Sequence, residues 1–170
     1  RQYADLGGRV LGSHFHYTWT KNLIPQWQST ATWSDSGPMA TPDLVDTSHP
    51  GGQSMAQWLL SVGASSVLGQ VPLSQKIRNA TAVAPTTTRW LYASGGTPTA
   101  PPTTHYLSFN TPVGVAPEAQ CGKVVYAGMH VSNGTVNSSF PSGCMTAMSP
   151  DEKAFAFLIF DLTTCVGQIF

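Results

Sequence analysis

The stretch Gly7-Gly8-Arg9-Val10-Leu11-Gly12-Ser13-His14 has the pattern of a turn followed by a short strand that ends in a histidine. A pair of glycines is typical of a helix end, so residues 1–6 are predicted to close a helix. The apolar run that follows is predicted to be a strand over residues 9–13. A second stretch, Val125-Tyr126-Ala127-Gly128-Met129-His130, repeats the design and predicts a strand over residues 123–130.

These two strand ends are the candidate site. In an open α/β sheet, ligands bind outside the carboxyl ends of the strands. If the two stretches are parallel neighbours, His14 and His130 lie at one edge as an acid–base pair or as ligands of a divalent metal such as Zn or Cu. His16 joins them only if the chain turns sharply. Each histidine is alternatively a hydrogen-bonded structural residue, and this interpretation applies more strongly to His16 and His105.

Periodicity places the remaining elements. A helix is predicted to begin at Gly51, because Met55, Trp58, Leu59 and Val62 recur at helical spacing. Residues 89–93 and 105–109 are predicted strands, residues 68–78 a short strand or connector, and residues 20–50 a long surface loop. Ser149-Pro150-Asp151-Glu152 forms a capping box that opens a last helix. That helix is apolar nearly all round, so burial of most of its faces is expected.

Length and composition indicate one domain over residues 1–170, because a domain has roughly 100–200 residues. Its predicted fold is an α/β open sheet with flanking helices and long loops. Charged residues make up 9% of the chain, against a typical ~25%. A surface built from Ser, Thr, Asn, Gln and Gly suits a secreted or cell-surface protein, so an extracellular location is expected.

Charge and hydropathy exclude two classes of function. The net charge is zero and no basic stripe is present, so binding of nucleic acid through its phosphates has no electrostatic basis. No apolar run approaches the ~20 residues that a membrane-spanning helix needs.

The three cysteines, Cys121, Cys144 and Cys165, form no CxxC pair, which argues against a zinc ribbon. An odd number in a secreted chain indicates one disulfide plus one free thiol, or a partner outside the chain. Three buried free thiols are the alternative. Three glycosylation sequons begin at Asn79, Asn133 and Asn137.

The stretches Gly7 to His14 and Gly122 to His130 resemble the strand-and-elbow and a later histidine strand of class I glutamine-amidotransferase-like domains, closest to the ThuA-like branch. The phrases SHFHYTW, CGKVVYAGMHVS, FPSGC and SPDEKAFAFLIFDLTTC also resemble a recurrent domain of large secreted bacterial proteins. The resemblance implies a flavodoxin-like open sheet that is incomplete at its N-terminal side. A missing N-terminal segment or another chain is then the implied partner.

Two departures from that family bear on activity. The elbow position, where the amidotransferases carry a cysteine nucleophile, holds His14 here. The position two residues after His130 holds Ser132 in place of a glutamate. A cysteine–histidine–acid triad therefore does not form from these positions, and glutaminase activity is not expected.

Three functions remain as hypotheses. The first is a non-catalytic structural or glycan-binding module of a secreted or cell-surface assembly, with Trp19, Trp27 and Trp33 stacking on sugar rings unless they pack in the core. The second is a metal-dependent or histidine-based enzyme for a carbohydrate-like substrate, with His14 and His130 at its centre and His16 or Asp35 in support. The third is a subunit of an extracellular filament.

Overall fold

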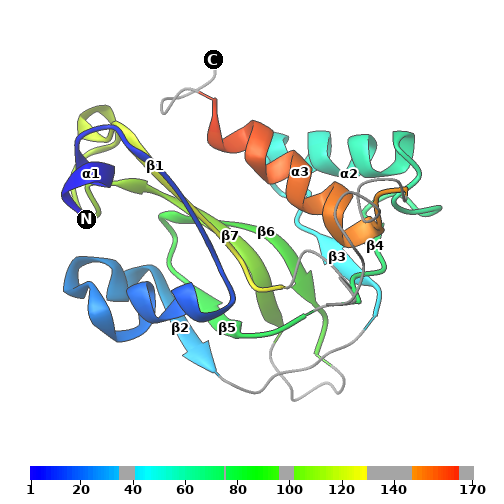
Figure 1. The fold of residues 1–170 in the computed structure, drawn as a ribbon, viewed down its shortest axis with the longest axis horizontal. Coiled ribbons are helices and arrows are strands. Elements are labelled where there is room, and N and C mark those ends of the chain that lie inside the picture. Colours follow the sequence, from blue (N-terminus) through cyan, green and yellow to red (C-terminus); the bar gives the residue numbers. More distant parts are fainter. Residues whose placement is uncertain (35–40, 75, 96–101, 130–146, 165–170) are drawn as a thin grey trace, which may run out of the picture.

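The computed structural model describes residues 1–34, 41–74, 76–95, 102–129 and 147–164. These residues form an open eight-stranded sheet with helices packed against it (Figure 1). The strands are β1 (Arg9–Ser13), β2 (Ala31–Ser34), β3 (Asp43–Val45), β4 (Gln70–Val71), β5 (Asn79–Val83), β6 (Thr87–Ala93), β7 (Thr103–Thr111) and β8 (Gly122–Ala127).

The strand order explains why the two histidine stretches are neighbours. The main path through the sheet runs β1-β8-β7-β6-β3-β4, while β5 pairs with both β2 and β7. β1 pairs with β8 in parallel, with Ser13 opposite Ala127 at their carboxyl ends. The other pairs of named strands are antiparallel. The predicted α/β open sheet is therefore confirmed, and the two histidine stretches meet the condition of being parallel neighbours.

The first helix, α1 (Gln2–Asp5), ends where the glycine pair predicts. Gly7 has φ +98°, a conformation that glycine adopts without steric cost. The Gly7 N–H donates to Ala4 O and the Gly8 N–H donates to Tyr3 O, at 3.0 and 2.9 Å. This pair of bonds is the helix ending expected of a left-handed glycine, and it directs the chain into β1.

The two long helices are α2 (Pro50–Ser61) and α3 (Pro150–Leu162), and both have side-chain caps. The imidazole of His49 accepts a hydrogen bond from Gly52 N–H at the start of α2. At the start of α3, the Ser149 hydroxyl and the Glu152 carboxylate each accept from the other residue's backbone N–H. Both helix predictions are confirmed, and the capping box is present.

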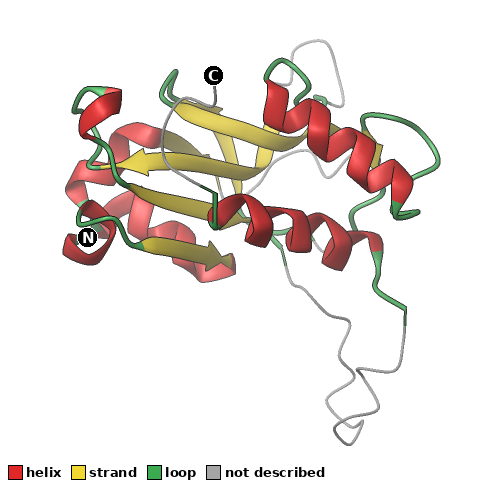
Figure 2. Cartoon of the chain, turned by 90° about the horizontal axis from the view of Figure 1, so that it is seen from above, coloured by secondary structure: helices red, strands yellow, loops and turns green. Residues whose placement is uncertain are grey.

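Short one-turn helices make up the rest: His14–His16, Pro25–Thr30 and Pro117–Ala119 are 3-10 turns, and Trp19–Leu23 is a π turn. Figure 2 shows α2 and α3 beside each other on one side and the short turns gathered at the other end. The molecule thus has two cores. One lies under α2 and α3 and includes Met55, Leu59, Leu91, Tyr106, Val125 and Leu158. The other lies under the short turns and includes Ala4, Tyr17, Trp27, Leu107, Phe109 and Tyr126.

One expectation about burial is wrong. The segment predicted as a surface loop over residues 20–50 contains two helical turns, β2 and β3, and it buries Trp27 and Asp43. These elements are too short to show a hydrophobic period, so the sequence pattern misses them. Helix α3 buries Asp151, Ala154, Leu158 and Leu162, whereas Ile159 and Phe160 are exposed.

The cap of α3 gives a stability prediction. Replacing Ser149→Ala removes the acceptor for Glu152 N–H and should lower the free energy of unfolding by about 1 kcal/mol. Ser149→Asp keeps an acceptor and should stay close to the native stability. Urea denaturation followed by circular dichroism measures both, and equal losses in the two variants would contradict the capping role.

Candidate functional site

The end of β1 is a strained turn. β1 ends at Ser13, and His14 begins a 3-10 turn with φ +49°. Among the described residues, only His14 and Arg78 are non-glycines in the left-handed region; Arg78 has φ +61°. A side chain in this conformation costs roughly 1–2 kcal/mol, so the surrounding structure must hold both residues there.

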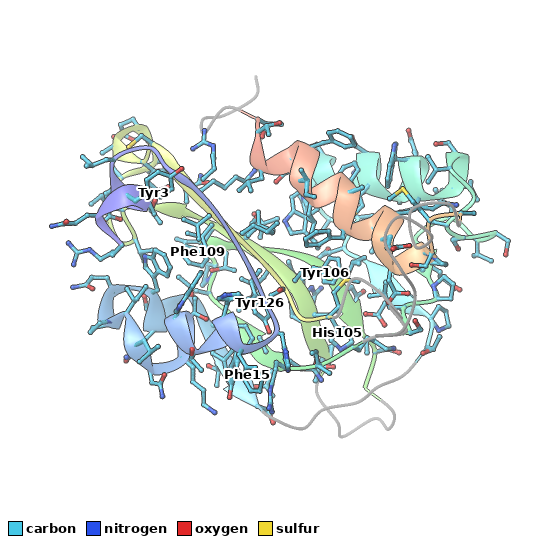
Figure 3. The ribbon with its side chains drawn as sticks, in the orientation of Figure 1. Tyr3, Phe15, His105, Tyr106, Phe109 and Tyr126 are labelled. Atoms are coloured by element: carbon cyan, nitrogen blue, oxygen red, sulfur yellow. The ribbon has the colours of Figure 1, made fainter. Side chains whose placement is uncertain are left out.

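One tyrosine hydroxyl serves both strained residues. Tyr126 O–H lies 3.0 Å from His14 O and 3.5 Å from Arg78 O. Burial raises the pKa of Tyr126 well above its ordinary value, outweighing the opposing effect of nearby Arg78. The hydroxyl therefore remains a proton donor at neutral pH. Figure 3 shows Tyr126 and Phe15 in the same part of the molecule, where β1 and β8 end.

Gly128, the residue after β8, brings a third segment against this edge. The Gly128 carbonyl accepts from Ile77 N–H at 2.8 Å, and the Gly128 N–H donates to His105 O at 2.8 Å. A Cβ placed on Gly128 would lie 2.6 Å from Arg78 O. Only glycine permits this close approach of three backbone segments.

The turn after β1 carries two pairs of rings, here named the aromatic ledge and defined by His14, Phe15, His16 and Trp19. The His14 and Phe15 rings are 4.0 Å apart, and the His16 and Trp19 rings are 4.4 Å apart, centre to centre. Phe15 is 60% exposed. Ser13 N–H donates to His16 Nδ1 at 3.1 Å, which fixes that ring on the turn.

The Arg78 guanidinium lies close to the aromatic ledge. The Arg78 guanidinium is 5.3 Å from the Phe15 ring centre and 5.4 Å from that of Tyr17. Both distances are within the roughly 6 Å over which a cation and an aromatic face attract each other. Phe15 therefore contacts both the Arg78 guanidinium and the His14 ring, and the residue still remains 60% exposed.

The predicted site residues are distributed as follows. His14, His16 and Trp19 come together on the ledge, while His130 lies outside the described residues. Trp33 is half-buried and lies edge-on to Tyr126. Trp27 is only 2% exposed and lies edge-on to Phe109, so its expected role in stacking on a sugar is wrong.

The metal and disulfide predictions find no direct support. Within the described part of the chain, no group of three His, Cys, Asp or Glu side chains could hold a metal ion. Cys121 is an exposed free thiol that forms no disulfide. Cys144 and Cys165 lie outside the described residues. The sequon at Asn79 falls on a buried side chain in β5, which disfavours glycosylation there.

Sequence reasoning missed a buried ion cluster beside the ledge, formed by Asp43, Lys76 and His105. Asp43 and His105 are fully buried, and Lys76 is 5% exposed. The Asp43 carboxylate contacts His105 Nδ1 through one oxygen, and its other oxygen is 2.8 Å from Lys76 Nζ. Lys76 Nζ also donates to Thr41 Oγ1 at 3.0 Å. A lone histidine inside a strand pattern is the only sequence signal for this cluster.

The pairing of β6 with β7 is irregular at His105. Arg89 lies opposite Leu107, Leu91 opposite Tyr106 and Tyr92 opposite Thr104, so Trp90 and His105 are both skipped and the register is the same before and after them. No described residue forms a hydrogen bond with His105 Nε2, which is buried. The neighbouring Tyr106 has its pKa raised by burial and by the charges of Asp151 and Asp43.

Comparisons of the chain with protein-family models, with curated proteins and with solved structures returned no match. The described helices include none that is long and apolar enough to cross a membrane.

The strain at His14 can be measured. Replacing His14→Gly should raise the free energy of unfolding by roughly 1 kcal/mol, because glycine adopts φ +49° without a Cβ clash and keeps the carbonyl that Tyr126 binds. His16→Gly is the matched control and should destabilise, since glycine only adds chain entropy there. Thermal and urea unfolding provide the test, and a loss of stability in His14→Gly would contradict it.

The ion cluster gives a paired prediction. Lys76→Met alone leaves a buried carboxylate without its ammonium partner and should cost about 3 kcal/mol of stability. The double variant Asp43→Asn/Lys76→Met removes both charges and should regain most of that loss. Urea unfolding measures the stability of both variants. Equal stabilities would contradict the prediction that an unpaired buried carboxylate destabilises the protein.

Proposed function

We propose that this chain is a glycan-binding module of a secreted or cell-surface protein and that the aromatic ledge holds the sugar. The observation that carries the proposal is the exposed side chain of Phe15, which contacts the His14 ring and is followed by the His16–Trp19 ring pair at the carboxyl end of a parallel strand pair. An exposed ring that lies beside imidazoles offers a sugar both a stacking surface and hydrogen-bonding groups.

The chemistry of the ledge fits a sugar. The apolar C–H face of a pyranose ring packs on an aromatic face, while its hydroxyls need donors and acceptors at the rim. The imidazoles of His14 and His16 flank Phe15 in the chain and supply such groups. Trp19, predicted as a ligand-binding residue, contacts the His16 ring. Phe15 takes the place that the sequence analysis gave to Trp27.

Composition supports an extracellular setting for this function. The chain carries 9% charged residues and no net charge, so its surface depends on neutral polar groups. A surface of this kind is compatible with binding uncharged polysaccharides, for which long-range electrostatic attraction plays no part.

Two phenylalanines of nearly equal exposure permit a matched test. Phe15→Ala should abolish binding to oligosaccharides, because it removes the stacking face. Phe160→Ala, at a position 64% exposed on α3, should leave binding unchanged. A glycan array followed by calorimetric titration with cellohexaose, chitohexaose and any further glycan that the array identifies makes the measurement. No binding by the unaltered protein, or equal losses in both variants, would refute the proposal.

A second candidate is a histidine-based enzyme that acts on a carbohydrate-like substrate at the same edge. Its support is the left-handed His14 at a sharp strand-to-helix turn, beside the end of a parallel neighbour. Elbows of this shape present a nucleophile in several hydrolase folds, and the ThuA-like resemblance would put an imidazole in that position. The imidazole would then serve as acid or base, with or without a divalent metal.

One substitution separates the two candidates. Asparagine tolerates the left-handed region, so His14→Asn should keep the fold of the turn while removing the imidazole. For a binding module, the variant binds and nothing is turned over in either protein. For an enzyme, products seen by mass spectrometry with the unaltered protein disappear in His14→Asn. Elemental analysis of both proteins reports on the metal.

A further inference from the structure

The segment Lys76–Ile77–Arg78 connects the buried ion cluster to the aromatic ledge. The Lys76 side chain lies in the interior, where its ammonium group contacts Asp43 and Thr41. Two residues later, the Arg78 guanidinium lies over the rings of Phe15 and Tyr17. The left-handed conformation of Arg78 turns the chain between these two environments.

The segment is fastened along its whole length. Lys76 forms an antiparallel bridge with Met129, and Ile77 N–H donates to Gly128 O. Tyr126 O–H reaches Arg78 O. The crowding around Gly128, where a Cβ would lie 2.8 Å from Ile77 O, leaves little room for the segment to shift.

The interior end of this segment also reaches β7. Gly128 N–H donates to His105 O, and the His105 side chain contacts the carboxylate that Lys76 binds. Asp43 therefore joins β3, β7 and the 76–78 segment through one carboxylate group. Removing that carboxylate or its ammonium partner breaks the side-chain link between the first residue of the segment and β3.

We propose that the buried Asp43–Lys76–His105 cluster positions the ledge for its ligand. By holding Lys76 in the interior, it keeps Arg78 in its left-handed conformation and its guanidinium under Phe15. The three cluster residues are positioning residues that do not touch the ligand. The step from position to affinity rests on the proposed function, whereas the step from the cluster to Arg78 does not.

The position of Arg78 has a spectroscopic signature. Its side-chain protons lie near two aromatic rings, so their NMR resonances should be shifted upfield by the ring currents. In Lys76→Met this shift should collapse toward the free arginine value. Met55→Ala creates a cavity in the core under α2 and α3 at a comparable cost in stability, and this variant should retain the upfield shift.

The double variant separates positioning from stability. Asp43→Asn/Lys76→Met should recover stability because no buried charge is left unpaired, yet its Arg78 resonances should stay collapsed because the tether is gone. Unshifted Arg78 resonances in the unaltered protein, native shifts in both Lys76 variants, or a collapse in Met55→Ala as well, would overturn the proposal.

The affinity for an oligosaccharide provides the second test of the proposal. With an oligosaccharide that binds the unaltered protein, Lys76→Met should weaken the affinity roughly tenfold, and Met55→Ala should change it little. Equal affinities in Lys76→Met and the unaltered protein would overturn the link to the ligand. If no oligosaccharide binds but the Arg78 resonances collapse as stated, the proposed function fails while the positioning of Arg78 by the cluster stands.

Discussion

The parallel pairing of β1 with β8 is the constraint on which the rest of this structure depends. It places Ser13 opposite Ala127, so that both chains leave the sheet at the same edge. His14 must then turn sharply at one strand end, and Gly128 must admit two other backbone segments at the next. The Tyr126 hydroxyl joins these features by bonding to His14 O and reaching Arg78 O.

Two chemically different surfaces meet at this edge, and a three-residue segment separates them. On the inside, Asp43, Lys76 and His105 are buried and pair with one another. On the outside, Phe15 and the rings beside it face solvent over a guanidinium. Buried ion clusters are weak contributors to stability, because desolvation offsets most of their attraction. Such a cluster is better explained by the geometry that it imposes on its neighbours, and here the neighbour is the aromatic ledge.

Sequence reasoning succeeded where local signals were strong. The glycine pair predicted the end of α1, helical spacing predicted α2, and the capping box predicted the start of α3. It failed for β2, β3 and the short helical turns, because three to six residues cannot display a period. It also placed Trp27 at the surface although the ring is buried, because exposure depends on which distant strand covers a side chain. The exposure of Phe160 could not be predicted for the same reason.

The sequence by itself determined the open α/β sheet, the ends of its main helices and the position of His14 at a strand end. These depend on residues close together in the chain, whose backbone preferences and hydrophobic spacing act locally. Only the tertiary structure decided that Asp43, Lys76 and His105 form one cluster, because they come from three segments that are far apart in the chain. It also decided that Phe15 is exposed and Trp27 is buried, because burial is set by packing between elements that are distant in the chain.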